Sequence, residues 1–231
     1  MIIKAENISR QFMRKRGESN IFQAVKDTSL TLNPGSLTVL TGRSGGGKST
    51  LMNMLSGLLA PTGGRVYADD TDLYSLDDDR LSLFRNEHFG MIPQGQSAVF
   101  SLNVLENILL PMRLYGMDRK KPEEFEKALA YADSLLELTG IKDLKDVKPN
   151  ELSGGEMRRM AIARALIRNP EVIFADEPTG DLDDANTEII LKLLKSLAQE
   201  GRTVLLVTHE KEAAEYADFM YRVDGGVLTE V

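Results

Sequence analysis

The sequence contains no cysteine and only two histidines, His88 and His209, among its 231 residues. Without cysteine, disulfide bonds and thiolate metal sites are excluded, and the composition suits a reducing cytosolic setting. Two histidines are too few for most zinc ligand sets, so a zinc protein is disfavoured.

Long apolar runs are also missing. Runs such as VLLV at residues 204–207 fall far short of the roughly 18 apolar residues that a membrane-spanning helix needs. The amino-terminal stretch MIIKAENIS lacks the apolar region of a secretory signal. We therefore expect a soluble chain without a membrane span.

Basic residues are not in excess. Lysine and arginine number 28 against 35 aspartates and glutamates, which gives a net charge of −7. Proteins that bind the nucleic-acid backbone usually carry a basic face, so no nucleic-acid partner is expected. The basic run MRKRG at residues 13–17 is short and is typical of a solvated loop.

The sequence does have the composition of a globular domain, with 42% hydrophobic and 27% charged residues. Alternation in MIIKAENISRQF and FQAVKDTSLTLN predicts two antiparallel strands, and SLTVL predicts a short buried strand. A helix that Gly57, Ala60 and Pro61 bring to an end is predicted next. The apolar positions spaced for one face of that helix are Leu51, Met54, Leu55 and Leu58.

Residues 95–150 differ in character, because SLNVLENILL and PEEFEKALAYADSLLELTG both have the pattern of helices. Strands resume at VIFA (172–175) and TVLLVT (203–208), and the alternation of helix and strand implies parallel pairing. We predict one α/β domain over residues 1–231. Its core comprises about residues 1–94 and 160–231, with an inserted helical subdomain of about residues 95–159.

The stretch GRSGGGKST matches the phosphate-loop pattern G-x-x-x-x-G-K-[ST] between a predicted strand and helix. Its glycines let successive N–H groups surround an anion, and the following helix adds the positive end of its dipole. Lys48 would reach the outer phosphates of a nucleoside triphosphate, and the Ser49 hydroxyl would ligate Mg²⁺. A glycine-rich turn with an exposed lysine is the alternative. The residues expected to bind the nucleotide are Gly42, Arg43, Ser44, Gly45, Gly46, Gly47, Lys48, Ser49 and Thr50.

Two further strands end in polar residues. VIFADEP places Asp176 and Glu177 at the carboxyl end of a buried strand, where ligands collect in parallel sheets. Asp176 can hold Mg²⁺, while Glu177 can orient and deprotonate an attacking water. TVLLVTHE ends at His209, which can hydrogen-bond a γ-phosphate or that water. A solvated acidic turn and a structural histidine are the alternatives, and His88 is interpreted as structural.

The segment ELSGGEMRRMAIARALIRNP predicts a helix that starts with a capping box of Ser153 and Glu156. The box leaves Gly154 and Gly155 unexplained, because glycine in a first turn lowers helix propensity. Without side chains there, a phosphate can approach the amino end of the helix. The amino end of this helix is therefore a second candidate phosphate-binding element, after the glycine-rich loop.

Taken together, these motifs resemble an ATP-binding cassette ATPase, the nucleotide-hydrolysing subunit of cassette transporters, along nearly the whole chain. The resemblance implies a P-loop NTPase core with a mostly parallel sheet, an N-terminal antiparallel β subdomain and a helical subdomain. It implies ATP and Mg²⁺ as ligands. It also makes Gln94 in MIPQ the lid glutamine at the metal and catalytic site, Phe12 the ring that stacks on adenine, and Asp183 in TGDLD part of the dimer-contact loop.

The resemblance further implies that two copies meet head to tail around ATP. Ser153, Gly154 and Gly155 of LSGGE would then contact the γ-phosphate held by the other copy, and bound ATP would stabilise the dimer. Hydrolysis would loosen the dimer and move an attached partner.

Within this family, FRNEHFG, ENILLP and FADEPTGDLD are similar to the branch of macrolide exporters, lipoprotein-release machines and antimicrobial-peptide resistance pumps. This implies an integral-membrane permease as partner, so the chain would lie at the cytoplasmic face of the membrane. Two residues depart from the common pattern: Glu156 replaces the glutamine of LSGGQ, and Pro93 stands where the branch usually has phenylalanine.

The permease contact is expected along residues 94–110, for which ordinary helical packing is the alternative. The leading interpretation is an ATPase that powers export or extraction of a peptide, lipoprotein or drug-like substrate. A regulatory ATPase that signals through a permease-like protein without transport is the second. Soluble cassette proteins of translation or DNA repair are the third, and they usually have two cassettes or a long coiled coil, which this chain lacks.

Overall fold

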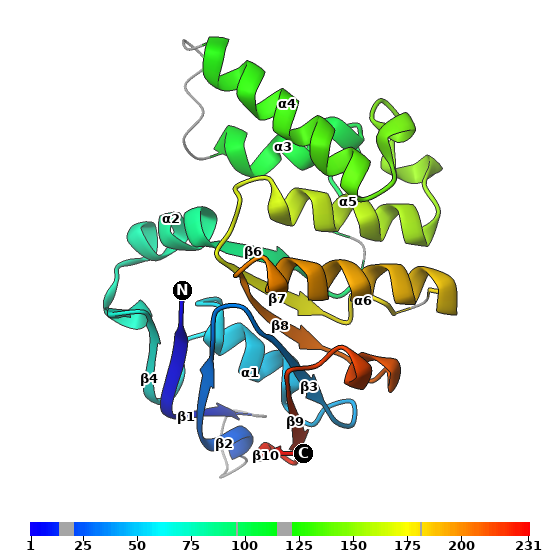
Figure 1. Ribbon diagram of the computed structural model, residues 1–231. Helices are drawn as coiled ribbons and strands as arrows, with labels where there is room; N and C mark the ends of the chain where they lie inside the picture. The colour runs from blue at the N-terminus through cyan, green and yellow to red at the C-terminus, as the bar shows by residue number, and fades with distance from the viewer. Residues whose placement is uncertain (14–20, 96, 115–121, 181) are drawn as a thin grey trace.

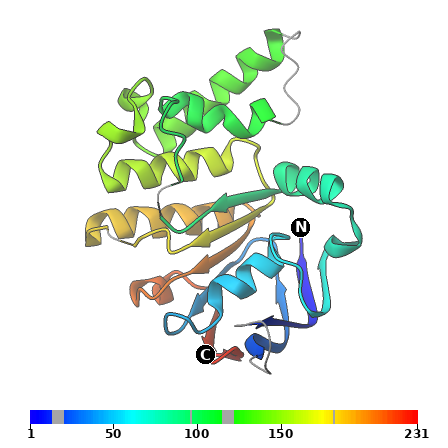
Figure 2. The ribbon, with the colours of Figure 1, turned by 180° about the vertical axis from the view of Figure 1, so that it is seen from behind.

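The structure is a computed structural model that describes residues 1–13, 21–95, 97–114, 122–180 and 182–231. The basic run at residues 13–17, predicted to be a solvated loop, lies outside the described residues except for Met13. Figures 1 and 2 show a central sheet, a smaller antiparallel sheet on one side of it, and a group of helices at the opposite end of the molecule. This arrangement confirms the predicted α/β fold class.

The central sheet has six strands in the order β10-β9-β3-β8-β7-β6. All of its neighbours pair in parallel except the edge strand β10, which pairs antiparallel with β9. The strands predicted from SLTVL, VIFA and TVLLVT are therefore confirmed, as is their parallel pairing. The strands of this sheet are β3 (Leu37–Thr41), β6 (Phe89–Ile92), β7 (Val172–Asp176), β8 (Thr203–Val207), β9 (Phe219–Asp224) and β10 (Val227–Glu230).

The central strands are buried on both faces, and their side chains alternate between two cores. In β7, Ile173 and Ala175 pack against α6 and the helices beyond it, whereas Val172 and Phe174 pack toward α1 and the antiparallel sheet. Such two-sided burial explains why β7 and β8 are continuous apolar runs in the sequence. The helices named here are α1 (Lys48–Leu55) and α6 (Asp184–Gln199).

The smaller sheet has the order β2-β1-β4-β5, and its strands pair antiparallel. Its alternating inward residues, such as Ile3, Ala5 and Leu32, share a core with α1. This confirms the two antiparallel strands predicted at the amino terminus. The strands are β1 (Ile3–Met13), β2 (Ile21–Leu32), β4 (Gly63–Ala68) and β5 (Thr71–Asp72), and α2 (Asp78–His88) follows them.

The helical end of the molecule consists of α3 (Val104–Leu114), α4 (Pro122–Leu138) and α5 (Gly154–Leu166), which pack together over apolar side chains. The start of α4 at Pro122 is as predicted, and Gly140 follows the helix with a φ of 67°. The helix predicted within SLNVLENILL continues through Pro111 to Leu114. The predicted boundary between residues 159 and 160 falls within α5.

The prediction that Leu58 lies on the apolar face of α1 is wrong. The helix ends at Leu55, and Leu58 is 53% exposed. Gly57 has a φ of 72°, and the backbone N–H of Leu58 returns to the carbonyl of Asn53, so the chain turns away before a further helical turn forms. The other three positions, Leu51, Met54 and Leu55, are buried as predicted.

The start of α5 is fixed by the predicted capping box. The Ser153 hydroxyl accepts a hydrogen bond from the Glu156 N–H at 3.3 Å, and the Glu156 carboxylate accepts from the Ser153 N–H at 2.8 Å. The Ser153 hydroxyl also donates to the same carboxylate at 2.8 Å. These hydrogen bonds, the one from the Ser153 N–H foremost, lower the pKa of Glu156.

Within the described ranges, none of the helices combines the length and the apolarity required to cross a bilayer.

Phe174 is fully buried, and its ring meets that of Phe89 edge-on at a centroid distance of 5.3 Å. Phe174→Ala should lower the free energy of unfolding by about 3 to 5 kcal/mol, because it leaves a cavity at the centre of the sheet. Denaturant unfolding measures this loss. Phe125→Ala, which removes a 38% exposed ring on α4, is the control and should change stability by less than about 0.5 kcal/mol. Equal losses for the two variants would contradict the assignment of the core.

The capping box should make stability depend on pH. The pKa of Glu156 is lower in the folded than in the unfolded chain, so its contribution is present above the ordinary value of 4.5 and is lost as the pH falls through the folded value. Ser153→Ala should cost about 1 kcal/mol at neutral pH. Glu156→Gln keeps a capping side chain that does not titrate. The wild type should therefore lose more stability than Glu156→Gln as the pH is lowered from neutral to below the folded pKa of Glu156; parallel curves would refute this.

Candidate nucleotide site

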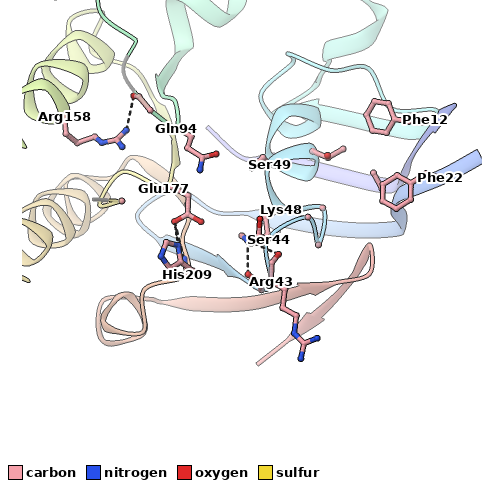
Figure 3. A pocket seen from close by; sticks show the side chains of 18 residues that line it. Phe12, Phe22, Arg43, Ser44, Lys48, Ser49, Gln94, Arg158, Glu177 and His209 are labelled. Atoms are coloured by element: carbon pink, nitrogen blue, oxygen red, sulfur yellow. Dashed lines mark hydrogen bonds and ion pairs between the residues drawn. The ribbon is translucent and has the colours of Figure 1, made fainter. Parts of the chain in front are cut away.

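Four loops that follow parallel strands meet at one edge of the central sheet and line a cleft of about 900 Å³ (Figure 3). The loop after β3 carries the glycines, Gln94 follows β6, Glu177 follows β7, and His209 follows β8. Ligands of open parallel sheets collect at this edge. The described residues that line the cleft are Phe12, Phe22, Ala24, Gly42, Arg43, Ser44, Gly45, Gly46, Gly47, Lys48, Ser49, Thr50, Gln94, Gly95, Arg158, Glu177, Gly180 and His209.

Two glycines of the loop have backbone requirements that other residues cannot meet. Gly42 and Gly47 have φ values of 135° and 110°, and an added Cβ would lie 2.1 Å from the carbonyl oxygen of Val223 and 2.3 Å from that of Ala24, respectively. The loop therefore packs closely against the backbone of β9 and β2, and it lines the cleft. The first turn of α1 has no side-chain cap, which leaves its N–H groups available to an anion.

Lys48 lies beneath this loop and is only 7% exposed. Its ammonium group donates to the carbonyl oxygens of Gly42 at 2.8 Å and Arg43 at 3.2 Å. The ammonium group is thus held against the loop whose backbone amides are near the cleft. Together they form a cradle that suits the phosphates of a nucleotide.

Asp176 is buried next to the cleft, and the hydroxyl of Ser49, which lines the cleft, donates to its carboxylate at 3.2 Å. Burial raises the pKa of Asp176, the Ser49 hydrogen bond opposes this shift, and the nearby Glu177 carboxylate adds to it. The side chain of Gln94 points into the same space (Figure 3).

This donor set fits Mg²⁺, which takes hard oxygen ligands. The described residues contain no cluster of three or more histidine, aspartate or glutamate side chains suited to a metal. Such a sparse site is typical of Mg²⁺ that shares its coordination sphere with substrate phosphates and water.

Glu177 has an unusual backbone conformation, with a φ of 47° at a residue that is not glycine. The strain is compensated by its N–H, which donates to the carbonyl of Val207 at 2.8 Å. Its carboxylate accepts a hydrogen bond from the backbone N–H of His209 at 3.3 Å and lies 2.8 Å from Nδ1 of the His209 imidazole. A carboxylate only accepts, so Nδ1 carries the hydrogen in this contact. Both side chains line the cleft, and a carboxylate paired with an imidazole in this way can act as a general base with an orienting partner.

The opposite end of the cleft is aromatic. Phe12 and Phe22 are paired in register across β1 and β2, and both rings line the cleft (Figure 3). The guanidinium of Arg10 lies 4.8 Å from the centroid of the Phe12 ring. Such rings can stack on a nucleobase. Phe22 was not predicted from the sequence, although its position opposite Phe12 follows from pairing the two predicted strands.

The structure does not bring Ser153, Gly154, Gly155 and Asp183 to the cleft of their own chain. The first three form the start of α5, where an added Cβ at Gly154 would meet nothing within 4 Å. Asp183 caps α6 by accepting from the N–H of Asn186 at 2.8 Å, and the hydrogen bonds from Asn186 lower its pKa despite slight opposition from burial.

Arg158 also lines the cleft, and no sequence signal pointed to it beyond its place in a predicted helix. Its guanidinium donates to the carbonyl of Pro93 at 2.9 Å. His88, interpreted as structural, lies away from the cleft, with Nδ1 2.9 Å from the Glu171 carboxylate.

Comparisons with known proteins agree with this geometry. Residues 25–180 match the family model described as ABC transporter. The chain is 39% identical over 225 residues to the lipoprotein-releasing system ATP-binding protein LolD of Bdellovibrio bacteriovorus, covering 97% of this chain and 98% of that protein. It is 41% identical over 227 residues to the macrolide export ATP-binding/permease protein MacB of Bartonella henselae, covering 98% of this chain but 33% of the relative.

Among solved structures, the chain resembles the ATP-binding cassette MJ0796 in a dimeric post-hydrolysis state bound to ADP and Pi. The TM-score is 0.87 and the identity 35%, over 99% of this chain and 98% of that one. Both the model match and the near full-length relatives identify the same family. The chain belongs to the ABC transporter family and is one of its ATPase cassettes.

Proposed function

We propose that this cassette dimerises around two ATP molecules and drives a separate membrane permease, for export or extraction of a peptide, lipoprotein or drug-like substrate. One observation carries the proposal. The phosphate loop, Glu177 and Gln94 line one cleft, and Asp176 is hydrogen-bonded to Ser49 of that lining. Residues 153–155 lie outside the cleft, with open space beside Gly154. The site is thus complete for binding but lacks part of its family's phosphate contacts until a second copy supplies them.

In this proposal Glu177 is the general base. Its carboxylate is hydrogen-bonded to the His209 imidazole, and both side chains line the cleft (Figure 3). Lys48 and the backbone amides of the glycine loop neutralise charge on the outer phosphates. Ser49, Asp176 and Gln94 would hold Mg²⁺, which neutralises charge on the phosphates when bound. Phe12 and Phe22 would hold the adenine at the other end.

The second copy would act through Ser153, Gly154 and Gly155, approaching with the amino end of α5, and through the Asp183 loop. The dimeric state of MJ0796 supports this arrangement, because that cassette is similar over nearly its whole length. A triphosphate buried between two faces stabilises the dimer by mass action, so hydrolysis would weaken it.

The permease contact is proposed along residues 94–110. Val99 and Phe100 in this segment are 38% and 52% exposed, which supports contact with another chain. MacB combines an ATP-binding part with a permease by name, and this chain spans a third of it. We place the cassette on the cytoplasmic face of the membrane, held by the permease. Co-purification of that permease, and identification of what stimulates ATP turnover, would test both the partner and the transport role.

Glu177→Gln tests the general base. The variant should bind ATP and accumulate as a dimer, while turnover falls about 10² to 10⁴-fold because the water is no longer deprotonated. Sedimentation in the presence of ATP and a phosphate-release assay measure the two effects. Glu230→Gln, at an exposed glutamate of β10, is the matched control and should hydrolyse ATP normally. Unchanged turnover in Glu177→Gln would falsify the assignment.

Asp176→Asn tests the metal site and separates stability from activity. Burial raises the pKa of Asp176 in the folded chain, so its charge destabilises the fold above that pKa. Asparagine keeps an acceptor for Ser49 without the charge. The variant should melt at a higher temperature without ligand, yet lose several kcal/mol of Mg²⁺-dependent transition-state stabilisation. Asp70→Asn, in the exposed turn after β4, should change neither. A lower melting temperature with intact turnover would contradict this role.

A further inference from the structure

Arg158 is a buried charge with no role in the mechanism proposed above. It lies in the second turn of α5, is 8% exposed, and reaches the nucleotide cleft beside Gln94 (Figure 3). A buried guanidinium is costly unless its donors are satisfied, so its hydrogen bonds indicate what the residue is for.

Those hydrogen bonds go to the backbone on both sides of Gln94. Nη1 of Arg158 donates to the carbonyl of Pro93 at 2.9 Å and to that of Gly95 at 3.5 Å. Pro93 has a fixed φ, and Gly95 adopts a φ of 80° that side chains rarely allow. One guanidinium therefore holds the loop segment from which the Gln94 side chain points into the cleft.

Arg158 is also connected to the start of α5, where residues 153–155 lie. Ser153 caps this helix, and Arg158 lies five residues further, roughly 7 Å along the axis. The capping box ties Ser153 to Glu156, so residues 153–155 move together with the turn that carries Arg158. Arg164 adds a second connection, because its guanidinium donates to the carbonyl of Ser97 at 2.6 Å.

We infer that Arg158 is a positioning residue that couples the two nucleotide sites of the dimer. It links Gln94, which faces the nucleotide of its own chain, to residues 153–155, which would face the nucleotide of the partner copy. A shift of the Gln94 loop when a triphosphate binds is passed to the start of α5 through a guanidinium and one rigid helical turn. The inference rests on the proposed ATP-dependent dimer.

Coupling of this kind is a free energy shared by both sites, so it must appear as cooperativity. Removing Arg158 should leave binding within one cleft intact and weaken only the step that needs both copies. A direct phosphate ligand would behave differently, because its loss weakens binding to a single chain as well. The two roles are therefore separable by comparing ADP binding to the monomer with ATP-driven dimerisation.

The test uses the full chain with Arg158→Met and Arg158→Lys, each with and without Glu177→Gln. Methionine keeps an unbranched side chain but has no donors, whereas lysine keeps the charge and can reach one of the two carbonyls. Arg168→Met is the matched control, because Arg168 lies beyond the other end of α5 in a separate groove beside Arg85. Melting temperatures with ADP report whether each variant is folded.

For Arg158→Met, calorimetry should give an ADP affinity unchanged within about two-fold. The ATP concentration for half-maximal dimerisation in the Glu177→Gln background should rise about ten-fold, and the Hill coefficient of hydrolysis should fall toward one, as expected for a lost coupling free energy. Arg158→Lys should recover part of both, and Arg168→Met should match the parent.

Equal weakening of ADP binding and dimerisation would assign Arg158 as a phosphate ligand and overturn the inference. Normal dimerisation and an unchanged Hill coefficient in folded Arg158→Met would overturn it too, while leaving the proposed function in place. Failure of the Glu177→Gln parent to dimerise with ATP would instead overturn the proposed function, and the coupling role with it.

Discussion

The nucleotide cleft depends on the in-register parallel pairing of β3, β8 and β7. Val207 is aligned with Leu40 on one side and with Asp176 on the other, so three strands end at the same level of the sheet. The residues that follow these strands line the cleft: the glycine loop follows β3, His209 follows β8 and Glu177 follows β7. A slip of one residue in β7 would exchange the two faces of the strand and move Phe174 from one core to the other, so core packing fixes the register that the site needs.

The site is built from local features that are unfavourable for the fold. Glu177 adopts a positive φ, Asp176 is a buried carboxylate with a raised pKa, and Gly42 and Gly47 press against neighbouring backbone. The surrounding strands compensate, above all through the hydrogen bond from the Glu177 N–H to Val207, which anchors Glu177 to β8 immediately after β7 ends. Apolar burial on both faces of the sheet offsets the free-energy cost of these features.

Helix α5 connects the helical end of the molecule with the loop that follows β6. Its first residues are outside the cleft and carry an exposed, capped end, whereas its later side chains pack with α3 and α4 or hold the loop after β6. Since Gln94 lies in that loop, the helix is in contact with the site of its own chain through Arg158 and presents its amino end to solvent. In the proposed dimer, the amino-terminal half of this helix would therefore serve both nucleotides, one through residues 153–155 and the other through Arg158.

The sequence alone determined the elements whose signals are local. The glycine loop, the capping box of Ser153 and the buried strands follow from residue spacing, because close backbone approach, helix capping and two-sided burial each demand particular residues. Leu58 was misplaced because periodicity does not reveal where Gly57 turns the chain. The places of Phe22 and Arg158 in the cleft could not be predicted from local sequence. Strand pairing brings Phe22 opposite Phe12, and helix packing brings Arg158 against the loop of Pro93. Only the tertiary structure decided those contacts, since they depend on the register and packing of separate elements rather than on any one segment.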